Sequence, residues 1–129
     1  MYQHPGNRPR FLSLTEFRFP LNAKLSAMHR ISGVLLSLCL LGFLALAHLI
    51  ILHPYVEFAD IRYHWISLLI ASTFWVLLSF HWLSGLRHLL AEHFTQVDCY
   101  QTINSPVISY LIILTWLLVS AFIFHQYWF

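Results

Sequence analysis

Residues 26–33, which read S-A-M-H-R-I-S-G, place a hydroxyl, an imidazole and a guanidinium directly before one of the longest apolar runs of the chain. Ionisable side chains at the mouth of a membrane span are costly unless they have a use. Ser26 and Arg30 are four residues apart and share one face of a helix. A hydroxyl donor beside a cation suits a ligand with carbonyl oxygens, such as a quinone. The alternative is a helix N-cap at Ser26 and a membrane-edge anchor at Arg30.

A second group of side chains follows a later apolar run, where His81, Gly85 and His88 are spaced i, i+4 and i+7 on one helical stripe. A lone imidazole in hydrocarbon needs a partner for its donor and its acceptor. One interpretation of His81 is an interhelical hydrogen bond to a serine, a threonine or the backbone. The other is an axial bond to haem iron, with Gly85 letting a flat macrocycle lie against the backbone. The side chains near the water edge that would face its propionates are Arg87, His88, His29 and Arg30.

Depth in the membrane separates His81 from the other histidines of the chain. It lies six residues inward from Arg87, which is about 9 Å along a helix. Because no other histidine of this chain lies at that depth, a second axial imidazole would have to come from another subunit. The alternative is a self-contained cytochrome that pairs His48 with His125, which share a level near the outer face.

Composition defines the elements that must position these residues. Of the 129 residues, 59% are hydrophobic and 9% are charged, which is too apolar for a soluble domain of this length. Three charge-free or nearly charge-free runs predict transmembrane helices at about 31–52, 65–86 and 106–126. Pro54 would end the first span, and Pro106 suits the first turn of the third. We therefore expect an all-α membrane protein that forms part of a heteromeric helix bundle.

Charge placement predicts the orientation of the chain. Five of its seven Lys and Arg residues precede the first span, and Arg62 alone lies in the connector between the first two. This asymmetry predicts a cytoplasmic N-terminus and a periplasmic C-terminus. Residues 1–25 are expected to form a polar cytoplasmic arm, and residues 26–129 the membrane domain. The first apolar run is too long for a signal peptide, and the chain lacks an Arg- and Ser-rich transit segment, so we expect a bacterial inner membrane.

Other features of the chain give no further site. Cys39 and Cys99 lack metal-type spacing, and both are expected to be free thiols. No internal repeat or low-complexity segment is evident. We expect a lipid bilayer and protein subunits as partners, and no nucleic acid.

Three motifs together carry a family resemblance: R-P at 8–9, S-A-M-H-R-I-S-G at 26–33 and H-W-L-S-G-L-R-H at 81–88. With the length and the three spans, they resemble the larger cytochrome b (cytochrome b556) anchor subunit of succinate dehydrogenase, the succinate:quinone oxidoreductase of respiratory complex II. The resemblance extends over nearly the whole chain. A related class, the anchors of fumarate reductase that lack haem, is the alternative.

The resemblance implies a role for each matching residue. It makes His81 an axial ligand of haem b, and it puts Ser26 and Arg30 at the ubiquinone site. It puts His29, Arg30 and His88 near the haem propionates. The second axial histidine would come from a smaller membrane anchor subunit. Electrons from succinate would pass through a flavoprotein subunit and an iron–sulfur subunit to quinone, so this chain alone would be an electron-transfer anchor without catalysis of its own.

Overall fold

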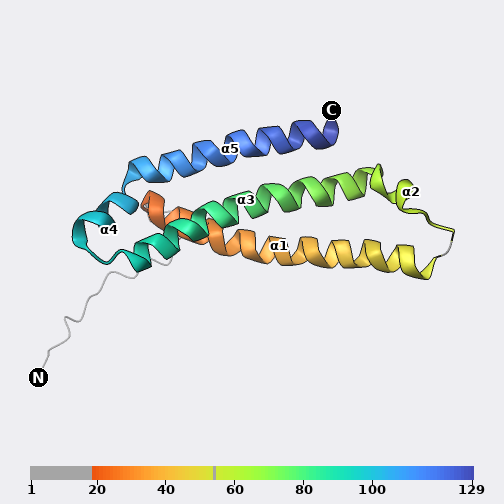
Figure 1. Ribbon diagram of the computed structural model, residues 1–129, viewed down its shortest axis with the longest axis horizontal. Helices are drawn as coiled ribbons and strands as arrows, with labels where there is room; N and C mark the ends of the chain where they lie inside the picture. The colour runs from red at the N-terminus through yellow and green to blue at the C-terminus, as the bar shows by residue number, and fades with distance from the viewer. Residues whose placement is uncertain (1–18, 54) are drawn as a thin grey trace, which may run out of the picture.

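The computed structural model describes residues 19–53 and 55–129, and all regular structure in these residues is helical (Figure 1). The helices in chain order are α1 (Leu21–Leu52), α2 (Phe58–Arg62), α3 (Trp65–His93), α4 (Val97–Ile103) and α5 (Pro106–Trp128). Three long apolar helices, which include α1, α3 and α5, could each cross a membrane. The prediction of an all-α chain with three membrane-spanning helices is therefore confirmed.

Two of the long helices extend beyond the predicted spans on the same side of the molecule. Helix α1 has 32 residues and is about 48 Å long at the usual helical rise, against a hydrocarbon thickness of about 30 Å. It begins ten residues before position 31, inside the segment expected to be an arm, whose residues 1–18 lie outside the described part. Helix α3 continues to His93, seven residues past the predicted end. The motifs at 26–33 and 81–88 therefore lie on continuous helices, whereas R-P at 8–9 lies outside the described residues.

The N-cap of α1 is Pro20, which places Ser26 in the second turn of the helix. The alternative interpretation of Ser26 as an N-cap residue is therefore wrong. The N-cap of α5 is Ser105, whose side chain accepts a hydrogen bond from the backbone N–H of Ile108, and Pro106 occupies the first turn as predicted. The two connectors between the long helices contain the short helices α2 and α4.

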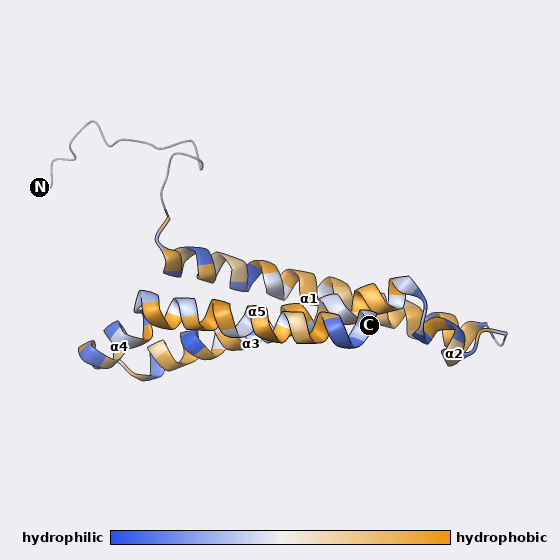
Figure 2. Ribbon diagram, turned by 90° about the horizontal axis from the view of Figure 1, so that it is seen from above, coloured by the Kyte–Doolittle hydropathy of each residue, from blue (hydrophilic) through white to orange (hydrophobic). Residues whose placement is uncertain are grey.

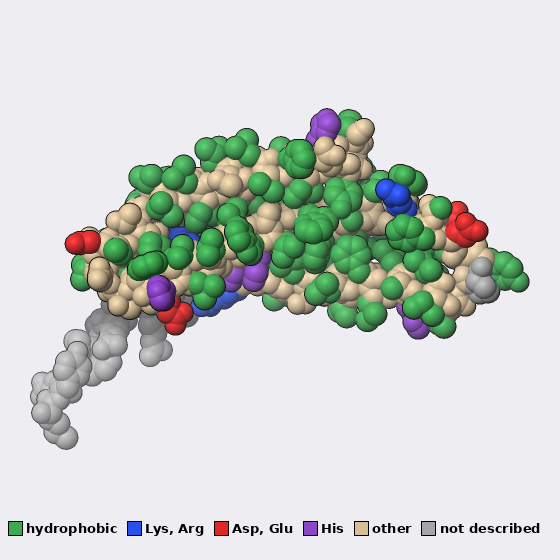
Figure 3. All heavy atoms as spheres, in the orientation of Figure 1, with side chains coloured by type: hydrophobic (Ala, Val, Ile, Leu, Met, Phe, Trp, Pro, Cys, Tyr) green, Lys and Arg blue, Asp and Glu red, His purple; other side chains and the backbone are tan. Residues whose placement is uncertain are grey.

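Helix α3 packs against both α1 and α5 (Figure 1). The residues buried between the helices are mostly polar: Ser32, Ser72, Ser84, Arg87 and Ser109, beside the apolar Leu25 and Phe80. The long helices are mostly hydrophobic in sequence (Figure 2). Large apolar side chains are exposed on the outside of the bundle, as the space-filling view shows for one face (Figure 3). This inverted pattern is typical of membrane bundles, in which small residues and interhelical hydrogen bonds hold the helices together.

Indole groups fix α5 against α3 along the bundle. The Nε1 of Trp116 donates to the backbone oxygen of Val76 at 3.0 Å, and its ring meets Phe80 edge-on with centroids 5.3 Å apart. Nearer the C-terminus, Trp128 Nε1 donates to Ser72 Oγ at 3.4 Å. These bonds satisfy indole N–H groups that would be costly to leave unpaired in lipid.

Arg87 joins the three long helices at the end where α1 begins. Its guanidinium donates to Asn22 Oδ1 of α1 at 2.9 Å and to Ser109 Oγ of α5 at 3.2 Å. The Ser109 hydroxyl also donates to Asn22 Oδ1, at 2.7 Å, and the Asn22 amide donates to the Asn104 backbone oxygen. Arg87 is only 4% exposed. Its side chain is thus buried in this network next to the histidines and does not line the groove beside them.

Candidate functional site

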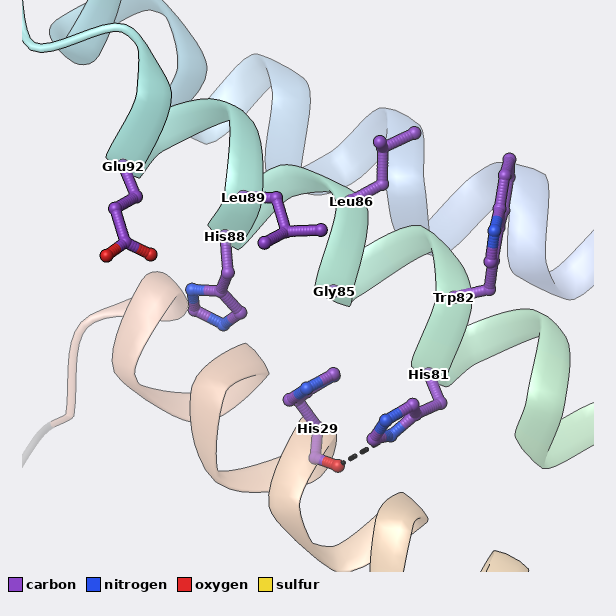
Figure 4. A pocket seen from close by; sticks show the side chains of 8 residues that line it. All are labelled: His29, His81, Trp82, Gly85, Leu86, His88, Leu89 and Glu92. Carbon is purple, nitrogen blue, oxygen red and sulfur yellow. Dashed lines mark hydrogen bonds between the residues drawn. The ribbon is translucent and has the colours of Figure 1, made fainter.

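Three histidines from the two motifs meet at the interface of α1 and α3. The rings of His29 and His81 are stacked, with centroids 3.9 Å apart and planes 16° apart. His88 meets His29 edge-on, with centroids 5.5 Å apart. Figure 4 shows all three rings between the two helices. The structure thus brings together the imidazoles that the sequence assigned to one end of the bundle.

Each of the stacked imidazoles is held by a serine of the opposite helix. His29 Nδ1 lies 2.8 Å from Ser84 Oγ, and His81 Nδ1 lies 3.0 Å from Ser32 Oγ. His81 Nδ1 also contacts the backbone oxygen of His29 at 3.1 Å (Figure 4). The interpretation of His81 as an interhelical hydrogen-bonding residue is therefore confirmed. Within residues 19–53 and 55–129, no hydrogen bond reaches the Nε2 atom of either ring.

Glycines make room for both rings. A Cβ atom on Gly33 of α1 would lie 3.0 Å from His81 Cε1, and a Cβ atom on Gly85 of α3 would lie 3.1 Å from His29 Cε1. Both distances are shorter than ordinary carbon contacts. The space beside Gly85 is expected from the sequence to admit a flat macrocycle, but the His29 ring occupies it.

The residues that hold the rings form a repeat that sequence reasoning missed. The pattern H-x-x-S-G occurs at 29–33 and again at 81–85. The pattern is only five residues long, and its importance becomes clear when the two helices are seen to pack against each other. Ser32, Gly33 and Ser84 were not among the predicted site residues. The signal that could have revealed them is this shared pattern on two successive spans.

A groove of about 420 Å³ lies beside the imidazoles. The polar part of its lining is His29, His81, His88 and Glu92, and α3 supplies the rest through apolar side chains and Gly85 (Figure 4). Its volume is in the range of small-molecule and cofactor sites. In Figure 3, histidine and cationic side chains show on the visible face between α1 and α3, toward the α4 end.

Ser26 and Arg30 lie beside this groove and do not line it. Ser26 is half-buried and Arg30 is exposed, one helical turn apart on α1. In the part of the chain that the structure describes, neither side chain has a hydrogen bond or an ion pair. Arg30 directly follows the groove residue His29 on α1. The hydroxyl and the guanidinium are therefore available to a ligand next to the histidines.

The structure does not support the pairing of His48 with His125. Both side chains are exposed, on α1 and α5 respectively. No hydrogen bond or ring contact joins them in the described ranges, and the ring near His125 is that of Phe129. A self-contained cytochrome built on these two residues therefore has no structural basis in this chain.

The family of the chain follows from its sequence. Residues 4–97, which carry all three motifs and the helices α1 to α3, match the family model of the succinate dehydrogenase/fumarate reductase transmembrane subunit. The chain belongs to this family. The match confirms the resemblance found in the motifs and agrees with three helices of membrane-spanning length.

A named relative supports the same conclusion for this succinate dehydrogenase/fumarate reductase transmembrane subunit. The succinate dehydrogenase cytochrome b556 subunit of Coxiella burnetii (strain RSA 493 / Nine Mile phase I) is 40% identical to it over 95 residues. The similarity covers 67% of this chain and 72% of the relative. The protein is thus a multi-pass membrane subunit of this enzyme class, and its site is best understood as part of a larger complex.

Proposed function

We propose that this chain is the haem b-binding membrane anchor of a bacterial succinate dehydrogenase, and that it helps to form the ubiquinone reduction site. The observation that carries the proposal is the pair of imidazoles whose Nδ1 atoms are engaged by serines while Nε2 is not. The cytochrome b556 name of the relative supports the haem assignment.

The residues of the groove fit an axial haem ligand. A backbone oxygen can only accept, so the contact between the His29 oxygen and His81 Nδ1 requires a proton on Nδ1. Nε2 of His81 then carries the lone pair that a haem iron needs. Haem b, when bound, supplies a one-electron redox centre whose potential depends on ligand and burial. We assign His81 as the ligand, with His29, Arg30, Gly85 and His88 as its environment.

Within residues 19–53 and 55–129, no second histidine is placed to share an iron with His81. His29 is the imidazole nearest to His81, but the two rings lie face to face. Two rings in this arrangement cannot approach one iron from opposite sides. We therefore assign the second ligand to a smaller anchor subunit, as the family resemblance implies, with a flavoprotein and an iron–sulfur subunit on the cytoplasmic side.

Ser26 and Arg30 supply the chemistry that quinone reduction needs from this chain. The Ser26 hydroxyl can donate a hydrogen bond to a quinone oxygen. The Arg30 guanidinium can stabilise the negative charge that develops on that oxygen as electrons arrive from the iron–sulfur subunit. The chain thus binds and polarises the quinone, while succinate is oxidised in another subunit.

Substitution of these two residues tests the quinone site. In the assembled complex, Ser26→Ala and Arg30→Leu are each expected to lower succinate:quinone reductase activity by about 10- to 100-fold, because each removes a contact to the developing charge. Succinate oxidation with a soluble dye should be unchanged, which separates quinone chemistry from assembly. Ser37→Ala is the control, since Ser37 bonds only to the backbone of its own helix. Normal quinone reduction in both variants would refute the assignment.

A further inference from the structure

We propose that Ser32 and Ser84 are positioning residues that set the tautomers of His81 and His29, each acting from the opposite helix. Each serine would keep the proton of its histidine on Nδ1 and leave Nε2 unprotonated, with a free lone pair. The part that concerns iron rests on the proposed function, because it assumes that His81 is a haem ligand. The tautomer assignment itself rests on the contacts of this chain alone.

The His81 tautomer follows from three mutual contacts among Ser32 Oγ, the His29 backbone oxygen and His81 Nδ1. Ser32 donates its hydroxyl proton to the His29 backbone oxygen at 2.7 Å. Its oxygen is then an acceptor for His81 Nδ1 at 3.0 Å, and the same Nδ1 lies 3.1 Å from the His29 oxygen. Both neighbours of Nδ1 are acceptors, so Nδ1 must be the donor. The proton is therefore on Nδ1, and Nε2 is unprotonated.

The His29 tautomer follows from the equivalent contact on the other helix. Ser84 donates its hydroxyl proton to the Phe80 backbone oxygen at 2.7 Å. The Ser84 oxygen then accepts from His29 Nδ1 at 2.8 Å. Ser84 is 1% exposed and Ser32 is 3% exposed, so water does not compete for either bond. His29 is thus held with Nε2 as a hydrogen-bond acceptor, in a residue that lines the groove.

The two contacts are the two halves of one symmetric arrangement. In each H-x-x-S-G pattern, the histidine bonds to the serine of the other pattern and lies against its glycine. Helices α1 and α3 run in opposite directions (Figure 1), so the two patterns are related by an approximate twofold axis between them. Each helix therefore completes the site of the other, and Ser32 and Gly33 of α1 belong to the histidine of α3.

This arrangement has a chemical consequence for the proposed ligand. A hydrogen bond donated by Nδ1 makes the imidazole a stronger electron donor through Nε2, which stabilises ferric over ferrous iron. Loss of the Ser32 hydroxyl leaves the His29 oxygen as the single acceptor for Nδ1. The ligand should then be a weaker donor, and the reduction potential of the haem should rise.

The test uses Ser32→Ala in the full complex, with Ser32→Thr as the conservative variant and Ser37→Ala as the control. We expect Ser32→Ala to keep its haem, to shift the haem midpoint potential upward and to change the ferric low-spin electron paramagnetic resonance spectrum. Ser32→Thr should return both toward wild type, and Ser37→Ala should change neither. A Ser32→Ala complex with the wild-type potential and spectrum would overturn the inference. Wild-type complex without haem would contradict the proposed function instead, and the two failures are thus distinct.

A second measurement does not depend on any Ser32 variant. Solid-state nitrogen NMR of the complex with ¹⁵N-labelled histidine, compared with the same complex carrying His29→Asn, isolates the signals of His29. We expect a protonated Nδ1 and an unprotonated Nε2. Protonation at Nε2 alone would overturn the tautomer assignment, whether or not Ser32→Ala retains its haem.

Discussion

At the scale of single residues, His81 uses its two ring nitrogens for different purposes. Nδ1 is fixed by the Ser32 hydroxyl and the His29 backbone oxygen, while Nε2 is not engaged within the described residues. The sequence offered a hydrogen-bonded packing histidine and an iron ligand as competing interpretations. The structure removes the conflict, because a ligand histidine is oriented by a hydrogen bond on its other nitrogen.

The glycine beneath His81 gives a prediction at this scale. Gly33→Ala would place a Cβ atom 3.0 Å from His81 Cε1, so the ring must move away from its bonds. We expect a lower haem-to-flavin ratio in the purified complex. Gly42→Ala on the same helix is the matched control, because its Cβ would meet the flexible end of Ile70 at 3.2 Å. Equal haem content in both variants would show that the fit of His81 against Gly33 is unimportant.

Sequence reasoning found some residues of this site and missed others for a physical reason. His29, Arg30, His81 and His88 were identified because charged and imidazole groups are rare in apolar helices. Ser32 and Ser84 were not, since serines occur along all three long helices. Which serine faces a histidine depends on the rotation of α1 against α3. Helices that are apolar on all sides carry little periodic signal for that rotation.

At the scale of helices, the network of Arg87, Asn22 and Ser109 holds α1, α3 and α5 together next to the histidines. Asn22 lies one turn before Ser26 and two turns before His29 on α1. The network therefore fixes the position of the first turns of α1 relative to α3. Only hydrogen bonds to neutral acceptors compensate the buried Arg87 charge there. The stability of the bundle is therefore sensitive to the loss of any one of these bonds.

Asn22 gives the prediction at this scale. Asn22→Leu removes the acceptor that serves both Arg87 and Ser109, and it should destabilise the complex by about 2 kcal/mol. Asn22→Asp keeps the acceptor and adds an opposite charge beside Arg87 but loses the donor to the Asn104 backbone oxygen, so it should be destabilised less than Asn22→Leu. Thermal unfolding of the detergent-solubilised complex measures both. A melting temperature of Asn22→Leu equal to that of Asn22→Asp would contradict this role.

The sequence predicted the centres of the three spans but not the full length of the helices. Hydropathy defines where a chain can cross lipid, whereas polar turns such as 21–30 remain helical because tertiary contacts hold them. Arg87 illustrates the same limit. A cation next to an apolar run is typical of a membrane-edge anchor, and only the packing of Asn22 and Ser109 shows that it is buried.

At the scale of the whole molecule, the histidine cluster and the Arg87 network lie toward the same end of the bundle. The start of α1, the end of α3 and helix α4 share that end, while α2 and the C-terminus lie at the other (Figure 1). We infer that the end with α4 faces the cytoplasm, where the iron–sulfur subunit would dock. The charge bias predicts this orientation, because Arg62 is the only Lys or Arg of the described residues near the opposite end.

Native Cys99 provides the test of this orientation. It is exposed, whereas Cys39 is partly buried within α1. With Cys39→Ser in place, a membrane-impermeant maleimide should label Cys99 in inverted membrane vesicles and leave it unlabelled in intact spheroplasts. Tyr55→Cys, at a site 94% exposed between α1 and α2, should show the reverse when Cys99 is removed. Labelling of Cys99 from the periplasm would invert the assigned topology.

The central claim is that this chain holds haem b through His81. The most direct test is the reduced-minus-oxidised absorbance spectrum of the purified complex, compared among wild type, His81→Ala and His48→Ala. We predict a low-spin b-type spectrum in wild type and in His48→Ala, since His48 is exposed away from the site, and its loss or displacement in His81→Ala. A wild-type complex with flavin but no haem, or an unchanged spectrum in His81→Ala, would contradict the account.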